Sequence, residues 1–446
     1  MPATPFSYTD DTLKQLVSDA LKYAKERGAT AADAEVSEGF GQTVTARQGE
    51  VETIEYNRDK GIGVTVYIGQ QRGHASSSDF APQAVRDTVD AALAIARYTA
   101  IDECAGLADP DMLAREFPDF DLLHPWEMPV ERAIEMARAC EAAGFAVDKR
   151  ITNSEGATIS TQQSHFIYGN THGFLAGYPS SRHGIWCALV AGKGDCMQRD
   201  DWYETARDPA ELAAPELVGR KAGERALARL KARKVKTAQV PVLFESGVAS
   251  SLMGHFVSAV SGGSLYRKSS FLLDSLGQQI FSPNVQIADL PHIPKALASG
   301  AFDEEGVATQ SRDIVKDGVV QGYFLASYSA RKLGMKSTGN AGGNHNLIMQ
   351  DTGEDFAALL KKLGTGLLVT EMMGQGVNAV TGDYSRGAAG FWVENGEITY
   401  PVQEITIAGN LKDMYKNIVA IGNDVSRRSS RQCGSILVAG MTLAGT

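Results

Sequence analysis

The segment ASSLMGHFVSAVSGGSLYRKSSFLL, residues 249–273, reads as a helix with one histidine, His255, followed by glycines and a basic, hydroxyl-rich stretch. Zinc peptidases carry two histidines and a glutamate on such a helix, because the metal needs imidazole ligands and the carboxylate deprotonates the attacking water. None of the eight histidines of the chain precedes a glutamate, so this zinc motif is absent. A lone histidine beside an apolar helix stripe is usually structural. We therefore expect His255 to be a hydrogen-bonded structural side chain.

Other side chains with ligand chemistry are dispersed along the chain. His165, His172 and His183 share a strand-rich region with Cys187, where a sheet could bring them together. Hydrogen-bonded histidines at sheet ends are the more frequent arrangement. The acidic run FDEEG, residues 302–306, could bind a cation or activate a water, but three carboxylates before a glycine more often mark a solvated turn. An independent hydrolase built on His183, Cys187 or this acidic run stays open.

A glycine-rich stretch, MGQGVNAVTGDYSRGAAG, leads into a hairpin and lacks the lysine-serine ending of a P-loop. Glycines let the backbone come close to another chain or to a ligand. Residues 374–392 suit strand addition, in which backbone hydrogen bonds hold an extended substrate. Turn packing explains the same residues equally well. The candidate contacts to a peptide are Gly376, Tyr384, Ser385 and Arg386.

The elements that position these residues are expected to form an α+β architecture. An amphipathic helix, two hairpins that supply four antiparallel strands, and a second helix open the chain, at residues 10–27, 42–57, 61–79 and 82–98. Asp10 or Asp11 can cap the first helix, and Gly28 ends it. A helix, a strand-rich stretch that turns at GNTHG and YPSS, and a basic helix follow, at residues 129–147, 151–205 and 215–232.

The C-terminal half is predicted to be mostly β. Its two best-signalled hairpins turn at Asp317-Gly318 and Asn395-Gly396, where both residues accept positive φ. The sequence thus predicts an N-terminal helix and antiparallel-sheet domain, a middle α+β domain and a β-rich C-terminal domain, spanning residues 1–105, 106–235 and 236–446.

The composition is that of a globular protein, with 446 residues, 43% hydrophobic and 22% charged. A net charge of −10 argues against nucleic-acid binding, because such proteins usually present a basic face. Five cysteines form no CxxC pair, so neither a disulfide framework nor a structural zinc site is predicted. No signal-peptide pattern is visible, and no apolar stretch approaches about 18 residues. We expect a cytoplasmic protein with reduced thiols and without a membrane span.

Several long motifs resemble one protein family. They are GSLYRKSSFLLDSLGQQI, AFDEEGVATQSRDIVKDGVV, SYSARKLGMKSTGNAGG and TGDYSRGAAGFWVENGEITYPVQEITIAGNLKDM, with GEVETIEYNRDKGIGVTVYIGQQRGHASSSD near the start. In this order they are similar to the PmbA/TldD family, and within it to the PmbA subunit type, also called TldE. The resemblance covers almost the whole chain, which makes it more specific than any single pattern above.

The resemblance implies a subunit of a cytosolic, heterodimeric zinc metalloprotease that cleaves unfolded proteins or peptides. In that family the TldD partner carries the zinc, on a helix with histidine and glutamate and on a distant cysteine. The family is implicated in processing a peptide antibiotic precursor and in degrading an antitoxin, and an older name links it to DNA gyrase. The implied fold has an N-terminal α+β domain, a middle segment and a β-rich C-terminal domain, with two subunits enclosing a chamber.

The resemblance also places the partner's zinc helix on the helix that carries His255. The two ligand positions fall on Met253 and Ser258, and the glutamate position falls on Gly254. These side chains cannot replace two imidazoles and a carboxylate. His255 falls between the ligand positions, and Cys433 lies near the partner's cysteine region. The resemblance therefore implies no catalytic residue, no metal ligand and no cofactor in this chain.

The functional hypothesis is a chain that completes the chamber and helps to hold an extended substrate while a TldD-like partner cuts it. Without that partner, the same face could form a homodimer. Two alternatives remain: the independent hydrolase described above, and a regulatory protein that acts on gyrase or nucleic acid. The acidic charge disfavours direct contact with DNA.

Overall fold

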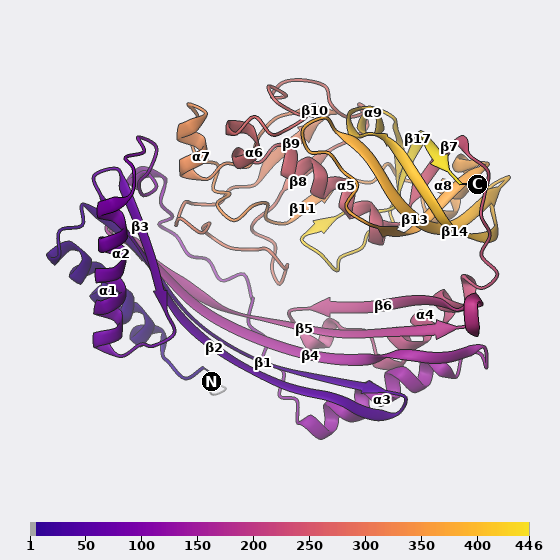
Figure 1. Ribbon diagram of the computed structural model, residues 1–446, viewed down its shortest axis with the longest axis horizontal. Helices are drawn as coiled ribbons and strands as arrows, with labels where there is room; N and C mark the ends of the chain where they lie inside the picture. The colour runs from indigo at the N-terminus through magenta and orange to yellow at the C-terminus, as the bar shows by residue number, and fades with distance from the viewer. Residues whose placement is uncertain (1–5, 446) are drawn as a thin grey trace.

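The computed structural model describes residues 6–445 and shows an α+β protein (Figure 1). A long, curved antiparallel sheet forms one layer, and the C-terminal half lies along the concave side of this sheet. The predicted fold class is confirmed. No helix among the described residues is long and apolar enough to cross a membrane.

The N-terminal sheet has the strand order β3-β2-β1-β4-β5-β6, and each pair of neighbours is antiparallel. The pairing of β1 with β4 joins the first 105 residues and the segment 106–235 in one continuous sheet. Strand β6 ends the order, so no other strand of residues 6–445 covers its outer edge. The strands are β1 (Ala31–Arg47), β2 (Glu50–Ile68), β3 (Gln71–Ser77), β4 (Ile151–Asn170), β5 (Leu175–Ala191) and β6 (Gln198–Ala206).

Two pairs of helices cover one face of this sheet. Even-numbered residues of β1 face both pairs, because Ala34 belongs to the core under the first pair and Val44 to the core under the second. The second pair packs closely at Gly219, where a Cβ would lie 1.7 Å from the carbonyl oxygen of Cys140. The first pair is α1 (Asp10–Glu26) and α2 (Pro82–Tyr98), and the second is α3 (Val130–Phe145) and α4 (Pro215–Ala228).

The N-terminal sheet corrects three details of the sequence prediction. The four expected strands are three, because β2 continues through residues 59–61 while it pairs with β1. No turn occurs at YPSS, since Pro179 lies inside β5, at a point that β6 does not reach and where a missing N–H removes no pairing with β6. The hydroxyl of Thr9 caps α1, so Asp10 and Asp11 lie in the first turn rather than at the cap.

The C-terminal half contains two sheets. In the larger one, with the order β14-β13-β12-β7-β17-β15, an additional pairing of β14 with β17 closes a ring of strands. The smaller one has the order β10-β9-β8-β11-β16. The larger sheet contains β7 (Ala238–Phe244), β12 (Gly366–Met373), β13 (Asp383–Glu394), β14 (Glu397–Asn410), β15 (Ile418–Ile421) and β17 (Ile436–Ala444). The smaller sheet contains β8 (Ile287–Asp289), β9 (Arg312–Lys316), β10 (Val319–Val320), β11 (Leu347–Met349) and β16 (Arg431–Gln432).

Both predicted hairpin turns of this half are confirmed. Strands β9 and β10 turn at Asp317-Gly318, and β13 and β14 turn at Asn395-Gly396, all four residues with positive φ. The helices of this half are α5 (Ser246–Ala259), α6 (Gly262–Tyr266), α7 (Ser327–Lys332), α8 (Phe356–Leu363) and α9 (Leu411–Lys416).

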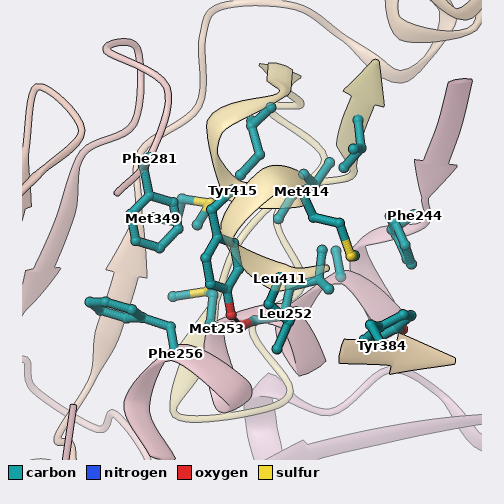
Figure 2. Close-up of a cluster of buried hydrophobic side chains, with 14 of the residues drawn as sticks. Phe244, Leu252, Met253, Phe256, Phe281, Met349, Tyr384, Leu411, Met414 and Tyr415 are labelled. Atoms are coloured by element: carbon teal, nitrogen blue, oxygen red, sulfur yellow. Dashed lines mark hydrogen bonds between the residues drawn. The ribbon is translucent and has the colours of Figure 1, made fainter. Parts of the chain in front are cut away.

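The C-terminal core fixes the orientation of α5, as Figure 2 shows. Tyr415 of α9 lies at the centre of this core, and its hydroxyl donates a hydrogen bond of 2.9 Å to the carbonyl oxygen of Leu252. Leu252, Met253 and Phe256 are buried in the same core. The face of α5 that carries His255 therefore points away from the centre of the core.

Candidate functional site

The first part of the candidate site is His255, on the outer face of α5. Its ring packs edge-on against the ring of Tyr384, with 5.9 Å between centroids. Its Nε2 is buried and has no hydrogen-bond partner among residues 6–445, so the expected hydrogen bond at this nitrogen is absent. Burial, and then the charges of Arg386 and Arg431, lower the pKa of His255. The imidazole is therefore held neutral beside two guanidinium groups.

The predicted zinc-helix positions point in different directions. Met253 is 1% exposed and packs into the C-terminal core, whereas Ser258 is exposed to solvent. Gly254 faces Arg431, and a Cβ at Gly254 would lie 3.0 Å from the Nη1 of that arginine. These three positions therefore do not converge on one point at which a metal could sit.

The residues around α5 do not fit a zinc ion. No group of three histidine, cysteine, aspartate or glutamate side chains in the described range is arranged to hold a metal. His255 offers one imidazole, but Arg386 and Arg431 place positive charge beside it. Burial, and then Asp424, raise the pKa of Cys433 to about 12, so this thiol keeps its proton at neutral pH.

Arg386 and Arg431, like Arg428, form no ion pair with a carboxylate of residues 6–445, unlike Arg225 and Arg229 nearby. The Nε of Arg386 is also buried without a hydrogen-bond partner. By contrast, Arg225 donates to Asp200 at 3.1 Å and to Glu245 at 2.9 Å. The face of α5 thus carries two positive charges that the described chain does not neutralise.

A cleft runs between β6 and the C-terminal half. Its smaller part, about 340 Å³, is lined by residues 199–203, by the start of α5, by β12 and by Arg386. Its larger part, about 1050 Å³, is lined by residues 202–206 and by segments of the C-terminal half. Both parts share Trp202 and Arg428, and the guanidinium of Arg428 lies 3.9 Å from the Trp202 ring centroid. The cleft therefore follows β6 along its length.

The outer edge of β6 presents backbone groups to this cleft. Arg428 donates a hydrogen bond of 3.2 Å to the carbonyl oxygen of Tyr203, which shows that this carbonyl points away from β5. Because backbone groups of a strand alternate in direction, those of Asp201 and Thr205 face the same edge. An extended peptide could pair with this edge, as in strand addition. The sheet is visible along its full length in Figure 1.

The predicted peptide contacts in the glycine-rich stretch separate in the structure. The Ser385 N–H donates to the Gly376 carbonyl at 2.7 Å, and a Cβ at Gly376 would lie 1.7 Å from the Ser385 carbonyl oxygen. Tyr384 is 1% exposed, a placement that does not fit direct contact with a peptide. Ser385 is exposed, and Arg386 lines the smaller cavity.

Strand addition at residues 374–392 has no free edge to use. Strand β14 covers one side of β13 along its whole length, and β12 covers the other side from Gly387 onwards. The remaining part of that side is closed by the bridge between Val377 and Tyr384. A free strand edge that faces the cleft lies instead on β6, which the sequence prediction missed.

The predicted histidine group does not form a site. His165 lies 3.4 Å from a carboxylate oxygen of Asp10, while His172 and His183 contact the carbonyl oxygens of Ala108 and His124. Each histidine thus contacts a different segment of the chain. Cys187 is fully buried, and its pKa is raised by the neighbouring Cys140 thiol and by burial, so it is no exposed nucleophile.

The acidic run 302–306 is a structured loop rather than the expected solvated turn. Asp303 is buried and accepts hydrogen bonds from the backbone N–H groups of Glu305, Val307 and Ala341. Burial is the main cause that raises the pKa of Asp303 to about 7. Its carboxyl group organises the loop.

Arg428 and Arg431 are functional candidates that the sequence analysis did not identify. Both belong to the run RRSSR at residues 427–431, which contains no acidic residue. That imbalance is a signal that can be read from the sequence. The proximity of these arginines to α5 and β6 depends on the fold and cannot be read from the sequence.

Three sequence profiles match the chain: PmbA/TldA metallopeptidase domain 1, the central domain and the C-terminal domain, at residues 32–96, 123–230 and 237–445. The chain is 52% identical to Metalloprotease PmbA of Escherichia coli O157:H7, over 97% of this chain and 96% of the relative. It is 48% identical to a Metalloprotease PmbA homolog of Haemophilus influenzae, over 98% and 97%. A crystal structure from Bacteroides thetaiotaomicron, of a candidate modulator of DNA gyrase, superposes with a TM-score of 0.93 at 28% identity, over 98% of this chain and 100% of the other.

Proposed function

Because the chain belongs to the PmbA/TldD family of metallopeptidases, we propose that it is the non-catalytic subunit of a two-chain zinc protease in the cytoplasm. In this proposal it holds an unfolded peptide in the cleft along β6, while a TldD-like partner carries the zinc and cuts the peptide. The observation that carries the proposal is the unpaired arginine pair, Arg386 and Arg431, beside His255 on α5.

Two guanidinium groups disfavour a bound cation by direct repulsion, which weakens sharply with distance but is strong in a partly buried site. They would also weaken the general base of a metallopeptidase, because a neighbouring arginine lowers the pKa of a carboxylate and makes it a poorer proton acceptor. We therefore assign the chemical step to the partner. The role left for this chain is to bind and orient the substrate.

The β6 edge suits that role because it recognises backbone rather than side chains. A peptide that pairs with a strand edge makes hydrogen bonds common to all sequences, so unfolded segments of many compositions can be accepted. The Arg428 side chain, which now donates to the Tyr203 carbonyl, would be exchanged for a peptide N–H. The wall of the C-terminal half opposite β6 would exclude folded substrates.

The proposal is tested by measuring cleavage of an unfolded, fluorogenic peptide by this chain alone, by a TldD-like partner alone and by the equimolar mixture. Each sample is measured with and without a chelator. We expect only the mixture to cut, and the chelator to abolish cutting. Chelator-sensitive cleavage by this chain alone would contradict the proposal, as would full activity of the partner alone.

A further inference from the structure

We propose that Arg386 and Arg431 form an anion site that binds the C-terminal carboxylate of a peptide held along β6. This inference rests on the proposed peptide-holding function, and it names the group of the substrate that the cleft recognises. A guanidinium group matches a carboxylate because two parallel N–H donors meet its two oxygens. Three observations lead to this assignment.

The first observation is that the carboxylates nearest the cleft already have partners. Arg225 bonds both Asp200 and Glu245, whereas Arg386 and Arg431 pair with no carboxylate of the described chain. The buried Nε of Arg386 still lacks an acceptor. Buried donors are almost always hydrogen-bonded in native proteins, so this atom points to a ligand oxygen.

The second observation is that Arg386 lines a space of suitable size. Arg386 lines the cavity of about 340 Å³, together with Gly247 and Ser251 of α5. This volume lies in the range of small-ligand pockets. His255 is one helical turn beyond Ser251 on the same face, and Arg431 packs where Gly254 has no side chain. Neutral His255 adds no charge of its own, and its buried Nε2 has no hydrogen-bond partner in the described chain.

The third observation is the direction of β6. The strand runs from the smaller cavity, at residues 199–203, to the larger one, at residues 202–206. Every neighbouring pair in this sheet is antiparallel, and a peptide that continues the pattern runs opposite to β6. Its C-terminus then lies at the start of β6, beside Arg386. The positively charged site therefore meets the negatively charged end of the peptide.

The test measures binding to the full chain of a ten-residue peptide of alanine, serine and valine, labelled with fluorescein at its N-terminus. Three forms are compared by fluorescence anisotropy: a free C-terminal carboxylate, a C-terminal amide, and the amide with one glutamate near its end. We expect the amide to bind about tenfold more weakly than the free acid. We also expect this difference to shrink as salt is added.

Arg386→Gln combined with Arg431→Gln should abolish the difference between acid and amide. The double lysine variant keeps the charge and should retain part of the difference. The matched control is Arg132→Gln with Arg138→Gln on α3, where both arginines are exposed and pair with glutamates, and there the tenfold difference should persist. Circular dichroism verifies that each variant is folded.

The three peptides separate the sources of the carboxylate. If only the free acid binds tightly, the C-terminus is the ligand, as proposed. If the glutamate restores binding to the amide, a side-chain carboxylate uses the same arginines, which keeps the anion site but overturns its assignment to the C-terminus. Equal binding of all three forms would overturn the inference, while the two-chain cleavage assay would still decide the proposed function separately.

Discussion

Two regions where the N-terminal sheet meets the C-terminal half collect charges of one sign. In the arginine face, Arg386 and Arg431 lie beside His255 without an ion-pair partner in the described chain. In the acidic junction, Asp33 and Glu35 of β1 lie near the loop 302–306; burial, and then the glutamates of this loop, raise the pKa of each carboxyl group, although Arg72 acts to lower that of Asp33. One region has an excess of cations, and the other an excess of anions.

The two regions differ in how they can relieve this excess. A carboxyl group can bind a proton, and burial with neighbouring carboxylates raises the pKa of Asp33 to about 7. An arginine cannot release its proton under physiological conditions, so its N–H groups need acceptors, as those of the buried Arg207 find in three backbone carbonyl oxygens. Unpaired carboxylates are therefore compatible with a purely structural role, whereas a buried arginine N–H that lacks an acceptor, such as the Nε of Arg386, indicates a ligand. The predictions below test this distinction.

The largest expected effect is on stability, from a paired arginine. Arg225→Met leaves the partly buried Glu245 unpaired and leaves Asp200 with only its 3.7 Å contact to Arg229. We expect a loss of about 2–4 kcal/mol in the free energy of unfolding, measured by urea denaturation. Arg386→Met with Arg431→Met leaves no carboxylate unpaired and should lower the free energy of unfolding by less than about 0.5 kcal/mol. A loss in the double variant as large as that in Arg225→Met would show that the arginine face is structural.

The next effect concerns pH and the acidic junction. Since the folded state holds the Asp33 proton up to about pH 7 and the unfolded state releases it near pH 4, this group stabilises the protein most at low pH. Its contribution is lost as the pH rises from about 4 to 7. Asp33→Asn removes this loss and should be more stable than the wild type by about 1–3 kcal/mol at pH 8, with a smaller difference at pH 5.

The measurement for Asp33→Asn is urea denaturation at pH 5, 6, 7 and 8. A gain that grows with pH supports the account. A difference that does not vary with pH would mean that the acidic junction does not hold the Asp33 proton. The pH dependence that remains in the variant's free energy of unfolding should come from Asp303, whose pKa is also raised to about 7.

The smallest effect comes from the loop that supports Arg386. Gly376→Ala would place a Cβ 1.7 Å from the Ser385 carbonyl oxygen, so the backbone next to Arg386 must shift. We expect a cost of about 1–2 kcal/mol in stability and a several-fold weaker binding of the free-acid peptide. Gly440→Ala, where a Cβ meets nothing within 4 Å, is the control and should change neither quantity. Unchanged peptide binding in Gly376→Ala would show that the conformation of this loop does not affect the anion site.

Much of the fold follows from local patterns in the sequence. The turns at Asp317-Gly318 and Asn395-Gly396, and the helix Pro82–Tyr98, occur where their local signals lie. The errors arose where distant pairing overrides local signals. Residues 59–61 and Pro179 look like breaks, but pairing with β1 and β4 carries the strands through them.

The site was harder to predict because it depends on non-local neighbours. Arg386 was identified from the glycine-rich stretch, but Tyr384, which alternation places on the same face of β13, is buried in the C-terminal core. Arg431 lies far along the chain from α5, and only the fold brings it to Gly254. The absence of a zinc motif on the His255 helix was readable from the sequence, whereas the arginine pair beside that helix was not.

The most direct test of the account is a steady-state measurement on the two-chain protease, with a free-acid peptide and either the wild-type chain or Arg386→Gln with Arg431→Gln. If this chain captures substrate and the partner cuts it, KM should rise about tenfold while kcat stays within about twofold. A fall of kcat by orders of magnitude with unchanged KM would contradict the account, because it would place this face of α5 in the chemical step.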